Sequence, residues 1–192
     1  MDTLLTFLHA IVGVLAEFPL VFYVLIFLFG LVIGSFLNVC IYRLPDENKS
    51  VARPRSYCPI CKKTIAWYDN IPLLSYVILR FKCRSCGAVI PIRYFLVELI
   101  TGCMFVFFFF YYGVTVYTLF LLYLFCLLFV ASIIDLKSRI IPDEITLYGM
   151  LFALLLSYVF PQLQGEASRR LAIANSVLGL LCGGGIIYCF SV

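Results

Sequence analysis

The stretch FPLVFYVLIFLFGLVIGSFLNVCIY, residues 18–42, decides the fold, because it runs for 25 residues without a charged side chain. A helix needs about 20 mainly apolar residues to cross the hydrocarbon core of a bilayer, so this stretch is long enough to span a membrane. The rest of the chain agrees, since 64% of the 192 residues are hydrophobic and 12% are charged. Soluble domains are about 45–50% apolar and about 25% charged, so the composition indicates a membrane protein.

Four further apolar runs predict more membrane helices. Residues 116–134 and 171–192 carry no charge, residues 94–112 contain only Glu98, and residues 145–160 form a shorter run with polar flanks. The first 17 residues contain no Lys or Arg, so they lack the basic start of a secretory signal. We expect that segment to form an interfacial or re-entrant helix leading into the first span.

The distribution of basic residues predicts the topology. Ten of the fourteen Lys and Arg residues lie within residues 43–93, and Lys137 and Arg139 follow the apolar run that ends at residue 134. The positive-inside rule therefore predicts that both loops face the cytoplasm. We attribute the net charge of +4 to this topology and expect no nucleic-acid partner, because no basic helix face or aromatic-interleaved basic patch is present.

Four of the nine cysteines form two Cys-x-x-Cys pairs in the larger basic loop, Cys58 with Cys61 and Cys83 with Cys86. Two such knuckles can present four thiolates to one zinc ion, and a cytoplasmic loop keeps its thiols reduced. Four cysteine ligands leave no open position, so the predicted zinc is structural. The alternative, two redox-active pairs, has no thioredoxin-like pattern around it.

The segment between the two knuckles and the remaining cysteines also allow predictions. Between the knuckles, WYDNIP at residues 67–72 either packs its aromatic side chains over the metal site, together with Tyr76, or is only a turn, which Asp69 and Asn70 favour. The other five cysteines lie in apolar runs and are predicted to be small core residues: Cys40, Cys103, Cys126, Cys182 and Cys189.

The stretch SIIDLKSRIIPDEIT, residues 132–146, places three carboxylates and two cations between two apolar runs. Asp135 lies at the end of a span, and ionisable residues inside a membrane mark functional sites by default. The alternative is that Asp135 only pairs with Lys137 or Arg139 at the interface. Asp143 precedes the next apolar run, and we expect it to be the N-cap of that helix.

Aspartic-protease chemistry would need a partner for Asp135. In that reaction two carboxyl groups share one proton, so that one activates water while the other polarises the carbonyl group. Within this chain the only candidate partner is Asp143, and we expect Pro142 to break the helix between the two. The other candidate lies beyond residue 192.

Three segments together resemble the bacterial type IV prepilin peptidases, membrane aspartic proteases that also N-methylate pilin subunits. They are GSFLNVCIYRLP at residues 34–45, the cysteine loop through IRYFLVELITG at residues 92–102, and DLKSRIIPDEIT at residues 135–146. The resemblance implies that Asp135 is the first catalytic aspartate, and it implies these metal ligands: Cys58, Cys61, Cys83 and Cys86. It also implies Zn²⁺ and S-adenosylmethionine as cofactors, prepilin or pseudopilin substrates, and the bacterial inner membrane as the location.

Two departures from the family pattern modify these expectations. The family's second aspartate follows a glycine-rich span in a Gly-x-Gly-Asp element, and none follows GLLCGGG at residues 179–185, so we expect a truncated or fragmentary member. The triple glycine is predicted to be a close helix-packing surface.

Phe81 stands just before Lys82, where many relatives have glycine. If methyl transfer needs a close approach to the backbone at this position, the Phe81 side chain would oppose that activity. Lys82 and Asp143 remain secondary site candidates.

The predicted fold class is an all-α polytopic membrane protein with a small cytoplasmic zinc-knuckle domain. Residues 1–44 form the N-terminal segment and first span, residues 45–93 the four-cysteine zinc-binding domain, and residues 94–192 an incomplete peptidase core. The predicted function is cleavage of basic leader peptides on the cytoplasmic side, with N-methylation of the new terminus. A catalytically incomplete zinc-knuckle membrane scaffold is the alternative.

Overall fold

The computed structural model describes residues 18–46, 50, 56–139, 142–165 and 168–191, with the backbone alone for residues 184–191. The interfacial helix expected in the first 17 residues lies outside the described part. The chain divides into two compact units, Met1–Cys126 and Leu127–Val192, and each is described by itself.

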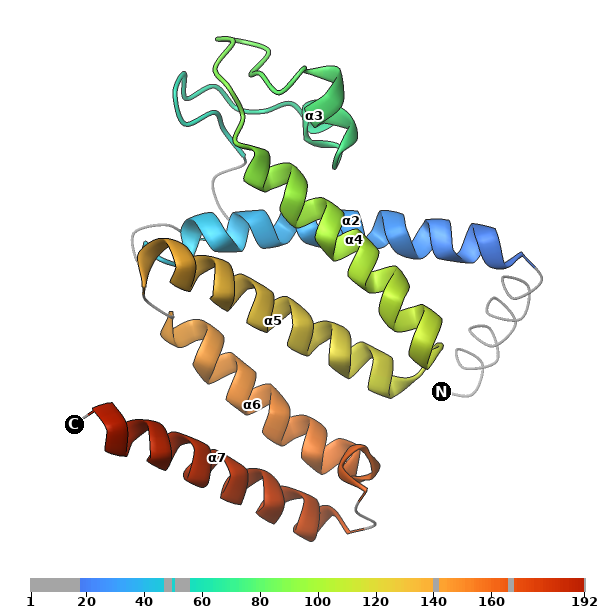
Figure 1. Ribbon diagram of the computed structural model, residues 1–192, viewed down its shortest axis with the longest axis vertical. Coiled ribbons are helices and arrows are strands. Elements are labelled where there is room, and N and C mark those ends of the chain that lie inside the picture. Colours follow the sequence, from blue (N-terminus) through green and yellow to red (C-terminus); the bar gives the residue numbers. More distant parts are fainter. Residues whose placement is uncertain (1–17, 47–49, 51–55, 140–141, 166–167, 192) are drawn as a thin grey trace. The chain divides into compact units, whose positions relative to one another are not determined.

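The described residues are mainly helical, which confirms the all-α prediction. They contain two isolated β-bridges and no longer strand. Three of the helices are long and apolar enough to cross a bilayer, and Figure 1 labels them α2 (Pro19–Arg43), α4 (Ile92–Tyr112) and α5 (Val116–Ser138). The other elements are η1 (Trp67–Asn70), α3 (Leu74–Ile78), α6 (Asp143–Val159), η2 (Pro161–Gln164) and α7 (Arg169–Ser191).

In the first unit, α2 and α4 cross at very close range, as Figure 1 shows. A Cβ atom at Gly30 would lie 2.8 Å from the Cα of Gly102, and one at Gly34 would lie 2.8 Å from the Cα of Glu98. Cβ atoms do not approach backbone so closely, so only glycine permits this separation of the two helices. Gly30 and Gly34 are four residues apart and therefore share one face of α2.

The apolar core of the first unit lies beside this crossing. Phe105 and Phe109 of α4 are buried together with Leu122 of α5, and Phe22 of α2 meets the ring of Phe109 at 6.0 Å between centroids. Aromatic side chains therefore hold these parts of the membrane helices together.

In the second unit, α6 and α7 are joined by a polar contact inside apolar surroundings. The hydroxyl groups of Ser157 and Ser176 are hydrogen-bonded to each other, and Gln164 Nε2 donates to Ser176 Oγ at 2.6 Å. The prediction that the triple glycine is a packing surface is wrong at Gly183, because a Cβ there would meet nothing within 4 Å. Close glycine packing occurs instead between α2 and α4.

The prediction that the isolated cysteines are core residues is also only partly correct. Cys40 and Cys126 are half-buried, whereas Cys103 and Cys182 are exposed, and Cys189 has a side chain outside the described set. A membrane helix turns part of its surface to lipid, and a small apolar thiol is as suitable there as in a core.

Candidate functional site

The two cysteine knuckles have the same backbone structure, repeated at an interval of 25 residues. The amide of the residue after the second cysteine donates to the carbonyl of the first cysteine, at 2.9 Å from Lys62 to Cys58 and at 2.9 Å from Gly87 to Cys83. Each of these donor residues has a left-handed backbone, with φ of 59° at Lys62 and 70° at Gly87. This tight turn directs both sulfur atoms of a knuckle toward the same side.

The four sulfur atoms of the knuckles meet. All of them lie within 4.8 Å of one another, and the Sγ atoms of Cys58 and Cys86 are 3.8 Å apart. A tetrahedral zinc site with Zn–S bonds of about 2.3 Å has sulfur atoms about 3.8 Å apart. The cluster therefore fits a single zinc ion, and no fifth ligand would be needed. Cys61 and Cys83 supply the other two sulfur atoms of this cluster.

The backbone of the first knuckle favours the thiolate form of Cys58. The amide groups of Cys61 and Ile60 point at the sulfur of Cys58 and lower the pKa of that thiol to about 6. A thiolate is the form that binds metal, so Cys58 is preorganised for this role.

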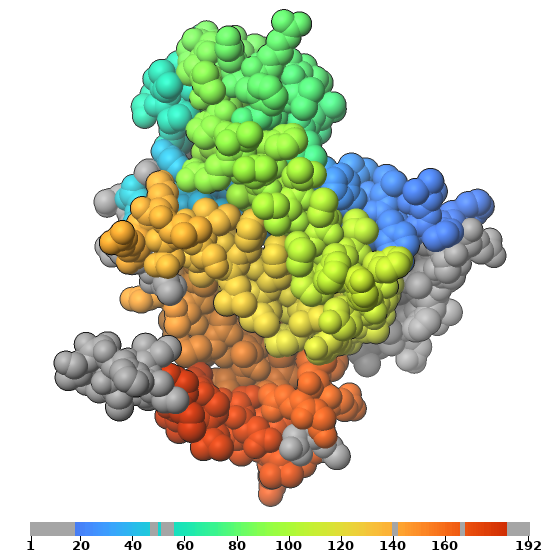
Figure 2. All heavy atoms as spheres, viewed as in Figure 1, coloured from blue at the N-terminus to red at the C-terminus, as the bar shows by residue number. Residues whose placement is uncertain are grey.

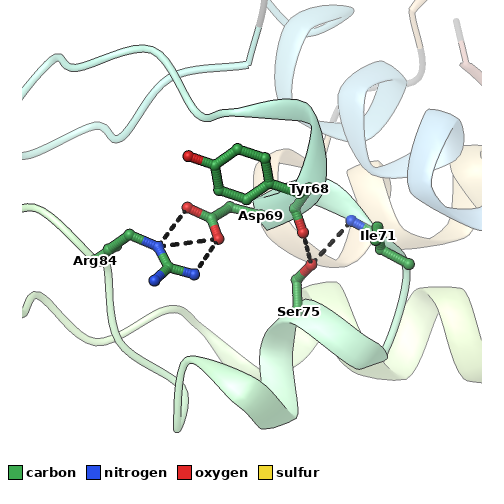
Figure 3. A network of polar contacts seen from close by, with 5 residues as sticks. All are labelled: Tyr68, Asp69, Ile71, Ser75 and Arg84. Carbon is green, nitrogen blue, oxygen red and sulfur yellow. Dashed lines mark hydrogen bonds and ion pairs between the residues drawn. The ribbon is translucent and has the colours of Figure 1, made fainter.

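An ion pair ties the second knuckle to η1. Arg84, which lies between two cysteines, donates from Nε to Asp69 Oδ2 at 2.8 Å and from Nη2 to Asp69 Oδ1 at 2.6 Å (Figure 3). The hydrogen bonds from Arg84 hold the pKa of Asp69 below its ordinary value. Next to it, Ser75 Oγ donates to the carbonyl of Tyr68 at 3.0 Å and accepts the Ile71 amide at 2.9 Å, as Figure 3 shows.

These contacts decide between the two interpretations of residues 67–72. The segment is a short 3₁₀ turn, and the Trp67 side chain is 71% exposed. Of the three aromatic side chains considered, only Tyr76 is buried, against Phe81 and Phe95. The turn interpretation is therefore correct.

Phe81 and the neighbouring Lys82 lie on the surface of the loop. Phe81 has φ of 63°, a left-handed conformation that glycine adopts without strain. Its ring nevertheless packs on Tyr76 at 4.5 Å between centroids. Lys82 is exposed and forms a β-bridge with Val89 that continues the second knuckle.

A cavity of about 420 Å³ lies between the knuckle loop and the adjoining ends of α2 and α4. Asn38 lines it and is 4% exposed. The Nδ2 of Asn38 donates to the Tyr94 carbonyl at 3.0 Å, while no described residue donates to its Oδ1. Glu98 also lines the cavity, and its Oε2 accepts the Leu73 amide at 2.9 Å. Buried acceptors need donors, so Asn38 Oδ1 is available to a donor group, from water or from a ligand, within this cavity.

The sequence predicted none of these cavity contacts. Asn38 and Tyr94 are 56 residues apart, and Glu98 and Leu73 are 25 apart. The one available signal was that Glu98 is the only charge in its apolar run.

Asp135 lies in the last turn of α5, and its carboxylate is exposed. In the part of the chain that the structure describes, no ion pair joins it to Lys137 or Arg139. Its backbone carbonyl accepts the amide of Arg139 at 2.7 Å. The interpretation of Asp135 as one half of an interfacial ion pair therefore receives no support.

The helix break before Asp143 is present, since α5 ends at Ser138 and α6 begins at Asp143. The prediction that Asp143 is the N-cap is wrong. Pro142 takes the N-cap position, with an extended backbone of φ −59° and ψ 136°, and no side-chain cap is formed. Asp143 is instead the first helical residue, where its charge still meets the positive end of the helix dipole.

Two family models match consecutive parts of this chain. The bacterial peptidase A24 N-terminal domain matches residues 28–112, which include the knuckles and the α2–α4 crossing. The type IV leader peptidase family matches residues 122–192, which include Asp135. A comparison with solved structures found no significant match.

Curated relatives agree with both models. The chain is 42% identical over 160 residues to a prepilin leader peptidase/N-methyltransferase of Myxococcus xanthus, covering 83% of this chain and 46% of that relative. It is 37% identical over 177 residues to one of Klebsiella pneumoniae, covering 88% and 72%. It is 36% identical over 187 residues to a type 4 prepilin-like proteins leader peptide-processing enzyme of Escherichia coli, covering 88% and 67%. The chain thus spans about half of the first relative and up to about three quarters of the others named here. Because these likenesses run through the membrane helices, the cysteine loop and the segment around Asp135, the chain belongs to the type IV leader peptidase family.

Proposed function

We propose that this protein cuts leader peptides from prepilin-like substrates by an aspartic mechanism on the cytoplasmic side of the bacterial inner membrane. The observation that carries the proposal is the match to the type IV leader peptidase family across the segment that contains Asp135. The relatives' names supply the substrate class and a second activity, N-methylation.

In this proposal Asp135 is one of two carboxyl groups that share a proton. The ionised carboxylate takes a proton from water, and the neutral carboxyl group donates a hydrogen bond to the scissile carbonyl. Asp135 is suited to this role by its exposed carboxylate at the end of an apolar helix, where a substrate helix leaves the bilayer. Its partner is either Asp143 or a carboxylate outside these 192 residues.

The cysteine cluster has a structural part in this proposal. Cys58, Cys61, Cys83 and Cys86 would hold one zinc ion and fix the loop that joins α2 to α4. A bound zinc ion supplies a cross-link here, since four thiolates leave no position for water.

The cavity beside Asn38 is the proposed binding site for S-adenosylmethionine, which would supply the methyl group. The free Oδ1 of Asn38 and the carboxylate of Glu98 are both acceptors suited to its α-ammonium group. Glu98→Gln keeps an oxygen for the Leu73 amide but removes the charge, so we expect about tenfold weaker binding of labelled S-adenosylmethionine. Val114→Ala is the control, because Val114 is 55% exposed and does not line the cavity. Equal binding by Glu98→Gln and Val114→Ala would refute this position for the methyl donor.

A cleavage assay on membranes tests the proteolytic proposal. The protein, expressed from its complete coding sequence, is incubated with a prepilin, and loss of the leader is followed by gel mobility. Asp135→Asn should abolish cleavage, because an amide can neither take a proton from water nor share one with a carboxylate. Asp143→Asn should retain cleavage when the partner of Asp135 is a carboxylate outside these 192 residues, since the variant then loses only a helix-dipole interaction of about 0.3–1 kcal/mol.

Immunoblotting for equal abundance keeps folding defects apart from chemistry. Cleavage by Asp135→Asn together with inactivity of Asp143→Asn would reverse the assignment. Inactivity of both variants would indicate that the two aspartates form the dyad themselves. An unsubstituted protein that binds metal but cleaves no prepilin would favour the scaffold alternative.

A further inference from the structure

Helix α3 has an unusual distribution of polar and apolar side chains for a helix in a basic loop. Its polar residues Ser75 and Tyr76 are buried, whereas Leu74, Val77 and Ile78 are 51%, 57% and 62% exposed. No charged side chain lies within the helix. A short helix that turns only aliphatic side chains outward needs an apolar environment on that side.

Contacts with α4 fix the position of α3 along that helix. The amide of Leu73, at the start of α3, donates to Glu98 Oε2 at 2.9 Å, and the Tyr76 ring lies 5.3 Å from that of Phe95. Glu98 is six residues after the first residue of α4, Ile92, which corresponds to about 9 Å along the helix axis. The start of α3 is therefore level with the second turn of a membrane helix, and not above its end.

The residues of α4 locate the membrane boundary at the same level. Arg93 and Tyr94 are the kinds of side chain that anchor a helix at the lipid headgroups, and the guanidinium group of Arg93 lies over the Tyr94 ring at 5.4 Å. From Phe95 onward Glu98 is the only charged residue of the helix. Figure 2 shows the loop, in teal and green, packed directly against this part of α4.

The charges around α3 suit an anionic lipid surface. Arg80 and Lys82 follow the helix closely, and both side chains are exposed. Long basic side chains beside an apolar face can reach lipid phosphate groups while the apolar side chains enter the bilayer.

We propose that α3 is an interfacial helix whose Leu74, Val77 and Ile78 side chains insert into the lipid bilayer beside α4. The knuckle loop is then held at the membrane by three contacts, through α2, α4 and α3, and is not a freely suspended domain. This inference concerns only the loop and does not depend on the proposed peptidase activity.

Tryptophan fluorescence in reconstituted vesicles tests the inference. Trp67 is the only tryptophan in the chain, so Trp67→Phe gives a background without fluorescence from this residue. Into this background are placed, one at a time, Val77→Trp and Ile78→Trp in α3, Leu96→Trp on the exposed side of α4, and Val89→Trp in the second knuckle. The vesicles contain phosphatidylcholine and phosphatidylglycerol, with or without bromine on the acyl chains.

We expect brominated lipid to quench the fluorescence of both α3 tryptophans to within about twofold of its effect on Leu96→Trp. Aqueous iodide should quench the two α3 tryptophans less than it quenches Val89→Trp. All four side chains are at least 43% exposed, so each site lies at the surface. The two positions in α3 guard against a local effect at one of them. If either α3 tryptophan responds to both quenchers as Val89→Trp does, the helix faces water and the inference is overturned.

Discussion

Lys62 and Gly87 occupy equivalent positions in the two knuckles, and both have a left-handed backbone. For a residue with a Cβ atom this conformation costs roughly 1–2 kcal/mol, whereas glycine adopts it freely. Lys62 offsets part of the cost by placing its ammonium group 5.8 Å from the centre of the Tyr57 ring. The two knuckles thus have the same fold with unequal strain.

Gly87→Ala should therefore destabilise the second knuckle by about 1 kcal/mol. A Cβ at Gly87 would meet nothing within 4 Å, so the loss would come from the backbone conformation and not from a clash. The measurement is the rate at which a chelator removes metal from the purified protein, which should increase. Gly87→Asn is the matched control, because asparagine tolerates this conformation better. Equal rates for the alanine and asparagine variants would contradict this explanation.

Replacing Cys58 and Cys61 together by serine should remove the bound metal. The hydroxyl group is a poor ligand for zinc, and the remaining two thiolates cannot complete a tetrahedron. Metal analysis of the purified protein should fall from about one equivalent to near zero. Cys103→Ser is the control, since Cys103 lies on the exposed side of α4 outside the cluster. Unchanged metal content in the double variant would eliminate the zinc site.

At the scale of elements, the crossing of α2 and α4 depends on glycine. Gly34→Ala would place a Cβ 2.8 Å from the Cα of Glu98, so the helices must separate, at a cost of about 1–3 kcal/mol. We expect a lower temperature of unfolding in detergent. Gly179→Ala in α7 is the matched control, because a Cβ there meets nothing within 4 Å. A loss as large at Gly179 as at Gly34 would show that helix contact is not the cause.

At the start of α6 the sequence predicted the position of the helix correctly but the N-cap residue incorrectly. Asp143 is a good capping residue by type, but Pro142 before it already has the extended backbone of an N-cap. The side chain of Asp143 is then one position too far into the helix for the usual capping geometry, and its contribution is reduced to the helix dipole.

At the scale of the whole molecule, the topology can be tested by labelling. We expect a cysteine at Ser50 to react with an impermeant maleimide only from the cytoplasmic side, and one at Gln162 only from the other side. Gln162 is preferable to Gln164, whose amide is hydrogen-bonded to Ser176. The test uses a background in which the exposed cysteines outside the cluster, Cys103 and Cys182, are replaced. The four cluster cysteines are kept, and labelling is measured against the same background without the added cysteine. Labelling of both positions from one side would overturn the predicted arrangement of spans.

The sequence by itself determined the membrane class, the approximate helix ranges, the helix break at Pro142 and the set of four cysteines. These are local properties, because hydrophobic run length and Cys-x-x-Cys spacing depend only on residues near one another in the chain. The family resemblance gave Asp135 its expected role, which the fold alone does not assign.

Only the tertiary structure decided which distant residues meet. It brought Gly30 to Gly102, Asn38 to Tyr94 and Leu73 to Glu98, and it left Cys103 and Gly183 without the packing expected of them. A membrane helix is apolar on nearly every side, so its hydrophobic pattern does not indicate which face meets a neighbour and which meets lipid. The fit between two helix surfaces determines which face of each helix packs against the other. A glycine or a buried amide contributes to this fit only when both helices are in place.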